Sequence, residues 1–401
     1  MVEQASGGKR AWRSFVPVRW VAAAGVGIGI LFGISAAQAQ CTITATQGSV
    51  GRDTTALFQS LFSSVNAIGS SITTVNTAFL TQTSAFLASP AGSQPNQFAG
   101  GVWIRGVGGD TTIDATSTGT RFNPTTGNRG THDCSLSTRS TFAGVQGGID
   151  IGRLDLGNTG WNGHVGVTAG YLSLDNKRAS LSTAVDVPFV GLYAALTTGG
   201  FFVDAQVRAD FFDMSLSDPS IAVRNQAIRA TSWGITSSAG YNFNIGDFFI
   251  EPSVGVVYSQ TEVDNWSMRT ILPSARLGPT PHIVATNLAT IETLLGRASA
   301  RVGRSFVAGQ LALHPFVAAS VWHEFAGRSA SIITNTNLVT SQTAFINNST
   351  SRIGTFGQYS IGAAANILNS PWLGYARFDY RNGSNIDGWG INGGIRYQFA
   401  P

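Results

Sequence analysis

The sequence predicts an all-β membrane protein, a closed antiparallel transmembrane β-barrel of twelve strands. Only 11% of the 401 residues are charged, whereas soluble domains have about a quarter. After the N-terminus, no apolar run approaches the roughly 20 residues that a membrane helix needs. From Gln97 to Phe399, segments of about 10–14 residues alternate in polarity and end at Gly, Asn, Asp or Pro clusters. This combination is typical of a barrel, in which each strand satisfies its backbone on a neighbour.

The N-terminal residues 1–39 form a predicted signal peptide. A basic stretch, Lys9–Arg19, precedes an apolar stretch of 15 residues, Trp20–Ile34. Ala37–Ala39 then matches a cleavage site, so we expect cutting between Ala39 and Gln40. The apolar stretch is too short for a membrane anchor. Because residues 1–39 hold a net +3 of the chain's +4, the basic balance indicates export and no nucleic-acid partner.

Residues 40–96 are predicted to comprise a short surface segment, a helix and a linker. Apolar residues from Leu57 to Phe79 are spaced 4, 4, 3, 4, 3 and 4 apart, which predicts a helix over residues 54–88. The helix could thread the barrel lumen, lie in the periplasm, or pack with other chains as a coiled coil. We favour the lumen, because twelve strands close a barrel in one chain and the other helix faces are rich in hydroxyl groups.

Residues 97–401 are predicted to form the barrel domain. Phe201–Phe212 alternates most clearly, with apolar Val203 and Val207 on one face and Asp204 and Arg208 on the other. The predicted strands lie near residues 98–109, 140–152, 161–174, 185–197, 200–213, 230–243, 247–261, 291–303, 311–326, 353–367, 372–381 and 388–399. The connections between them alternate long and short, as expected for long extracellular loops and short periplasmic turns.

The two cysteines predict a disulfide. Cys41 lies at the mature N-terminus and Cys134 in the first long loop. A bond requires both at one membrane face, and it would hold the N-terminus outside while the helix returns through the lumen. Two unpaired thiols or intermolecular bonds remain the alternative.

Charged side chains on the polar strand faces predict a charged lumen. The predicted lumen charges are Arg105, Arg208, Arg297, Arg301, Arg377, Arg396, Asp150, Asp204, Asp210, Glu251, Glu324 and Asp379. They could set the ion selectivity of a pore or pair with one another to stiffen the barrel and hold the helix. The chain lacks G-x-S-x-G, H-E-x-x-H and C-x-x-C patterns, so we expect no enzyme activity, no cofactor and no metal site.

From about Gly101, the chain resembles the translocator domain of autotransporters. The matching segments are Gly101–Gly106, Phe142–Asp150, Phe249–Pro252, Tyr258–Gln260, His314–Phe316, Trp322–Phe325, Asp379–Arg381 and Gly394–Phe399. The resemblance implies a monomeric barrel in the outer membrane of a Gram-negative bacterium, with an internal helix and a passenger at the cell surface.

That resemblance also implies partners. They are outer-membrane lipid and lipopolysaccharide, Sec export, and the barrel-insertion machinery, which would read Tyr397 and Phe399 near the C-terminus. Gln40–Asp53 would be a very short passenger. The expected function is surface display, adhesion or recognition. A porin-like channel is the main alternative, and a barrel hydrolase would need Ser and His close together on one face.

Overall fold

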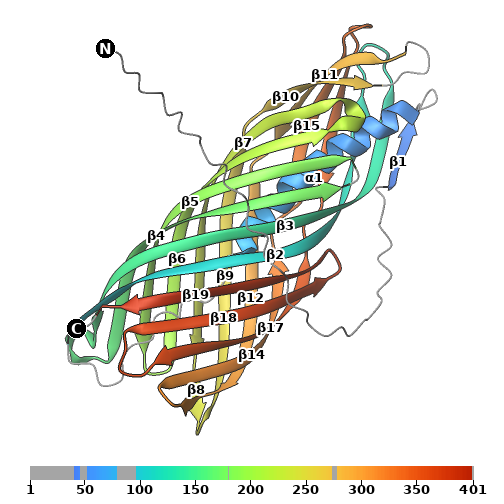
Figure 1. The fold of residues 1–401 in the computed structure, drawn as a ribbon. Coiled ribbons are helices and arrows are strands. Elements are labelled where there is room, and N and C mark those ends of the chain that lie inside the picture. The colour runs from blue at the N-terminus through green and yellow to red at the C-terminus, as the bar shows by residue number, and fades with distance from the viewer. Residues whose placement is uncertain (1–39, 46–51, 79–95, 179, 273–277, 400–401) are drawn as a thin grey trace, which may run out of the picture. The chain divides into compact units, whose positions relative to one another are not determined.

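The computed structural model describes residues 40–45, 52–78, 96–178, 180–272 and 278–399, which form a β-barrel with one long helix inside it (Figure 1). The predicted signal peptide, including Ala39, lies outside the described residues, as do residues 79–88 of the predicted helix. The barrel strands are β2 (Gln97–Phe122), β3 (Arg129–Leu154), β4 (Trp161–Arg178), β5 (Leu181–Thr198), β6 (Phe201–Asp218), β7 (Val223–Tyr241), β9 (Phe248–Val263), β12 (Ile291–Arg304), β14 (Leu311–Glu324), β17 (Thr355–Ile367), β18 (Trp372–Gly383) and β19 (Ile386–Gln398).

These twelve strands pair in one antiparallel ring. The last strand closes it, because β19 pairs with β2 from Ile386↔Ile113 to Gln398↔Gly101. Each predicted strand corresponds to one strand of the ring, so the predicted fold class is confirmed. Closure leaves no open strand edge at the level of the membrane.

The predicted long loops prove to be largely strand. β2 and β3 continue as a paired hairpin out to Phe122↔Arg129. The remaining short elements are β1 (Gln40–Ala45), β8 (Phe243–Ile245), β10 (Trp266–Leu272), β11 (Thr280–Leu288), β13 (Phe306–Ala308), β15 (Ser329–Asn337), β16 (Thr343–Thr350) and the one-turn helices η2 (Leu156–Asn158) and η3 (Pro219–Ile221). β16 pairs with β15 and β2, and β11 pairs with β10 and β15.

We call the resulting extension of the barrel the outer wall. It consists of β10, β11, β15, β16 and the ends of β2–β7 at residues 111–140, 172–187 and 212–230.

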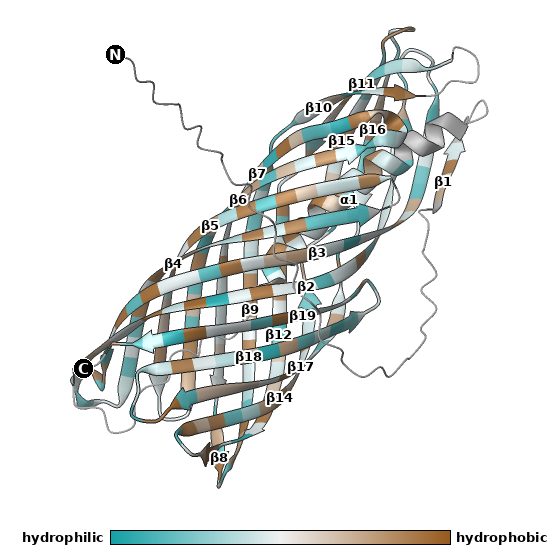
Figure 2. Ribbon diagram, viewed as in Figure 1, coloured by the Kyte–Doolittle hydropathy of each residue, from teal (hydrophilic) through white to brown (hydrophobic). Residues whose placement is uncertain are grey.

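The two faces of a strand exchange polarity where the strand enters the outer wall. On β6, the inward face carries Asp204, Arg208 and Asp210, and then Met214 and Leu216. The outward face of the same strand changes in the opposite sense, from Val203 and Val207 to Asp213, Ser215 and Ser217. The outside of the barrel is therefore apolar at membrane level and polar beyond it. In Figure 2, brown and teal bands follow one another along the strands, because successive residues alternate between hydrophobic and hydrophilic.

Glycines on the lumen side make room for aromatic rings from the neighbouring strand. Trp103 lies directly opposite Gly148, and a Cβ at Gly148 would come within 2.6 Å of the indole ring. The same close approach occurs for Tyr193 and Gly166, Phe189 and Gly170, Phe202 and Gly240, Phe249 and Gly303, and Phe316 and Gly362. Larger residues opposite these rings would displace them, which accounts for some of the 48 glycines of the chain.

The helix α1 (Arg52–Ala78) begins two residues before its predicted start. Its apolar residues Leu61, Phe62, Val65, Ile68 and Ile72 are all buried. In the part of the chain that the structure describes, no helix has the length and apolarity of a membrane span.

Candidate functional site

From Leu61 to Ala78, α1 packs in an apolar core formed with the outer wall. Phe62 and Ile68 have no exposed surface. Wall residues in the same cluster include Leu136, Leu172, Val185, Met214, Leu216, Ile228, Met268, Val284, Ile333 and Ile346. At about 1.5–3 kcal/mol for each fully buried large apolar side chain, this core holds the helix far more strongly than a few polar contacts could.

Polar residues of α1 bond to polar residues on the wall. The Asn66 amide donates to Thr138 Oγ1 at 2.9 Å. The Asn176 amide, from β4, donates to Ser71 Oγ at 2.7 Å. Deeper in the barrel, the Asn76 amide donates to Ser259 Oγ at 2.9 Å. Because buried polar groups without partners are costly, these pairs fix the rotation of the helix as well as its depth.

Two arginines of the barrel wall hold the C-terminal end of α1. Arg381 donates to the Thr77 carbonyl oxygen at 2.9 Å and to Thr77 Oγ1 at 3.1 Å. Arg208 donates to the Val75 carbonyl oxygen at 3.4 Å. The last turn of α1 contains no basic residue, so the wall supplies the cations that favour a helix C-terminus.

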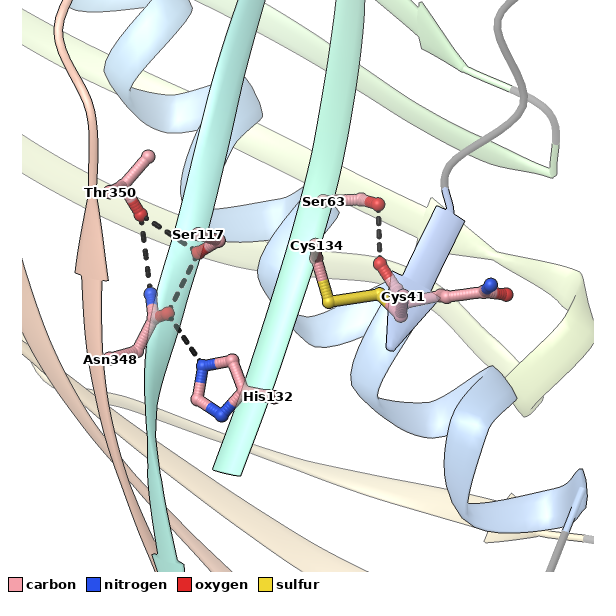
Figure 3. Close-up of a disulfide and its surroundings, with 8 residues drawn as sticks. Cys41, Ser63, Ser117, His132, Cys134, Asn348 and Thr350 are labelled. Atoms are coloured by element: carbon pink, nitrogen blue, oxygen red, sulfur yellow. Dashed lines mark hydrogen bonds between the residues drawn. A yellow bond between two sulfur atoms is a disulfide. The ribbon is translucent and has the colours of Figure 1, made fainter. Parts of the chain in front are cut away.

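A disulfide joins β1 to the outer wall (Figure 3). The bond links Cys41 and Cys134, whose Cα atoms are 4.1 Å apart, and β1 pairs with β3 over its whole length. Beside the bond, the His132 ring stacks on Phe62 with centroids 4.1 Å apart and bonds to Asn348 Oδ1 at 3.1 Å. Burial lowers the pKa of His132, although the bond to Asn348 acts in the opposite direction. The N-terminal segment is thus fixed at the outer end.

A buried ion network occupies the other end of the lumen. Asp150, on β3, accepts two bonds from Arg396 of β19, at 2.7 and 2.8 Å. It also accepts from the Tyr193 hydroxyl at 2.7 Å and contacts His164 Nδ1 at 3.1 Å. Trp103 donates to the same Tyr193 hydroxyl. Since β2 lies between β3 and β19, this network spans the seam where the ring closes.

The other predicted lumen charges mostly form pairs along the wall. Arg208 pairs with Asp210 at 2.7 Å, Arg301 with Glu251 at 2.5 Å and Arg377 with Asp379 at 2.9 Å. Arg105 donates to Gln146, Asp204 accepts from Ser238, and Arg297 lies 5.5 Å from the ring centroid of Trp322. Glu324 pairs with Arg352 at 3.5 Å. All twelve predicted charges therefore face inward, but they form several separate pairs and not one network.

Sequence reasoning missed Arg381 and Arg352. Arg381 shares the inward face of β18 with Arg377 and Asp379, so alternation alone could have identified it. Arg352 lies between β16 and β17, where no regular pattern marks its direction.

Ser305 and His314 are the one Ser–His contact near the periplasmic end among the described residues, with Oγ and Nδ1 2.8 Å apart. The positively charged side chain of Arg301 interacts electrostatically with the His314 ring. A cation opposes the imidazolium that a general base must form. In the described ranges, no group of three or more His, Cys, Asp or Glu side chains could hold a metal ion.

The closed ring, the lipid-type outer face and the helix in the lumen define a bacterial outer-membrane barrel with a resident plug. The autotransporter beta-domain family model matches residues 102–379. The chain belongs to this family, and it is an outer-membrane protein of a Gram-negative bacterium.

Known proteins resemble this chain at low identity. Probable autotransporter YcgV of Escherichia coli (strain K12) is 27% identical over 220 residues, which is 53% of this chain and 20% of that protein. The match thus spans about a fifth of its length. The transport unit of the autotransporter AIDA-I from Escherichia coli covers 83% of this chain and 98% of its own, with 12% identity and a TM-score of 0.50. The beta domain of the Bordetella autotransporter BrkA covers 75% and 100%, with 19% identity and a TM-score of 0.49.

Proposed function

We propose that this chain displays its outer wall and N-terminal segment for recognition or adhesion, and that its lumen does not conduct solutes. The observation that carries the proposal is the apolar core between α1 and the outer wall. A helix held by this core and by Arg381 is a fixed plug. These contacts disfavour the porin-like alternative, which requires a lumen free of the helix.

We propose that export and assembly follow the usual course of an outer-membrane protein. Residues 1–39 would direct Sec export, with cleavage between Ala39 and Gln40. The insertion machinery would read Tyr397 and Phe399, which lie at the end of the last strand of the ring. Tyr397 pairs edge to face with Trp372, and the Phe399 amide bonds to Gly100 on the first strand of the ring. The barrel would act as a monomer among lipids and lipopolysaccharide.

We further propose that this barrel has no catalytic role. The position of Arg301 next to His314 argues against use of the Ser305–His314 pair as a nucleophile and base.

Surface display can be tested with epitope tags in intact cells. One tag is placed in the turn between β15 and β16, after Leu338, and the matched control in the turn between β5 and β6, at Gly199. We expect an antibody to label the first tag in intact cells and the second only after permeabilisation. Labelling of the Gly199 tag alone would reverse the orientation and contradict the proposal.

A further inference from the structure

The strand β1 has one open edge. On one side it pairs with β3, from Gln40↔Ser135 to Ala45↔Gly130. In the described part of the chain, no strand pairs with its other side, and no backbone hydrogen bond joins Cys41 or Ile43 to another segment. Unpaired edges at a surface are templates for strand addition, which proteins normally cover, shorten or charge.

The pairing register shows which backbone groups face the open edge. In antiparallel pairs, opposite residues with Cα atoms near 4.5 Å do not bond to each other, whereas bonded pairs lie near 5.5 Å. Cys41 and Cys134 are directly opposite with Cα atoms 4.1 Å apart. The N–H and C=O groups of Cys41, and by alternation those of Ile43 and Ala45, therefore point away from β3.

The open edge is held in a fixed position. The disulfide fastens β1 to the outer wall, and Cys41 and Ile43 pack, half-buried, against the apolar core. Thr42 and Thr44 are exposed on the opposite face. A template that is already extended and anchored loses little conformational freedom when another strand binds, so more of the interaction energy appears as affinity.

We propose that the open edge of β1 binds an extended segment of a partner polypeptide, which adds a strand to the outer wall. This inference rests on the proposed display of the outer wall at the cell surface. Only another backbone offers donors and acceptors that alternate at strand spacing, so the partner is a polypeptide and neither a lipid nor a sugar. Its residues alternate, with apolar side chains on the side of Cys41 and Ile43 and polar ones on the side of Thr42 and Thr44.

The test uses a phage-displayed library of random linear peptides, selected on the purified full mature chain in detergent. Ile43→Pro removes an N–H that faces the open edge, and it costs no bond to β3. Thr42→Ala is the matched control, because it changes only an exposed side chain. We expect selected peptides with alternating polarity whose affinity falls about tenfold or more on Ile43→Pro and stays unchanged on Thr42→Ala.

A second measurement uses the unaltered protein and does not depend on the folding of a variant. Each backbone nitrogen of a selected peptide is methylated in turn, and binding should fail at every second position. Equal affinity for Ile43→Pro, no period of two in the methylation series, or a library without binders overturns the inference. Epitope labelling in intact cells would still succeed in those cases, so display and strand addition are judged separately.

Discussion

The two halves of the lumen are built in opposite ways. In the outer half, α1 meets an apolar core, whereas the other half is lined by buried ion pairs such as Asp150–Arg396. The two halves differ because the barrel is surrounded by lipid at one level and by water at the other. At membrane level, apolar side chains must face lipid, so polar ones face the lumen. Beyond the membrane the outside is water, so the polar face turns outward and the lumen side becomes a hydrophobic core. The plug is therefore held mainly outside the membrane.

The largest effect is expected from a charge in the outer half. Ile68→Asp would place a carboxylate where the native side chain is fully buried. Because unpaired buried charges are very costly, we expect the helix to leave its site and its amides to lose protection from hydrogen exchange. Ile68→Val is the control, at a cost of about 0.5–1.5 kcal/mol. Unchanged protection in Ile68→Asp would contradict the apolar anchoring.

The next effect is expected from a broken pair in the other half. Asp150→Asn leaves Arg396 buried without its partner, which costs about 3–5 kcal/mol. We expect the barrel to unfold at a lower temperature, seen as the heat-induced mobility shift of outer-membrane barrels on gels. Asp133→Asn changes an exposed carboxylate on the outer wall and should leave the shift unaltered. Equal behaviour of the two variants would show that the seam network contributes nothing.

Removal of the disulfide should affect the outer half alone. The bond closes a loop across 93 residues, and such bonds typically contribute about 2–4 kcal/mol. With both cysteines replaced by serine, we expect faster hydrogen exchange in β1 and the first turns of α1, and no change in β17–β19. A ring that melts earlier in this variant would indicate that the outer half also supports the barrel.

A smaller effect is expected where the two halves meet. Arg381→Met removes two bonds to Thr77, and bonds to charged groups contribute about 1.5–3 kcal/mol each. We expect the last turn of α1 to exchange faster while the first turns keep their protection. Arg269→Met, at an exposed position of β10 in the outer wall, serves as the control. Loss of protection along the whole helix would place its main anchor at this end.

The smallest effect is a pH dependence confined to the outer wall. Burial lowers the pKa of His132 and of His282, against opposing hydrogen bonds to Asn348 and Asn335. The unfolded imidazole then binds a proton more readily than the folded one. The stability that depends on these residues is present above about pH 6.5 and falls as the solution becomes more acidic. After correction for intrinsic exchange rates, β11 should lose protection near pH 5, and less so in His282→Gln. Protection that rises on acidification would contradict this assignment.

The alternation of polarity was sufficient to predict the ring but not the outer wall. Phe201–Phe212 follows the lipid-facing pattern, so β6 could be located from the sequence. Residues 214–218 still alternate, but with the two faces exchanged. A prediction that requires apolar residues on one continuous face therefore ends the strand at the membrane boundary, and it interprets the residues beyond as a loop. The exchange of faces is itself the signal that a strand continues into water.

Of the contacts around α1 and the lumen, the disulfide could be predicted from the sequence, because two cysteines in an exported chain commonly bond to each other. Cys41 and Cys134 were predicted to form a disulfide at one membrane face, and they are bonded in the structure. Arg208–Asp210 and Arg377–Asp379 each lie two residues apart on one strand, so alternation alone could have identified these pairs. Arg396–Asp150 and Arg301–Glu251 join different strands, and the register across the ring decides them. The contact of Arg381 with the end of α1 depends on how deep the helix lies, and its packing and polar contacts with the wall set that depth.

The most direct test of the plugged lumen is single-channel recording of the full mature chain in planar lipid bilayers, beside the Ile68→Asp variant. The account predicts no steady open pore for the native chain and a large, sustained conductance once the helix has lost its apolar anchor. A native chain that conducts steadily, at the level of the variant, would contradict it.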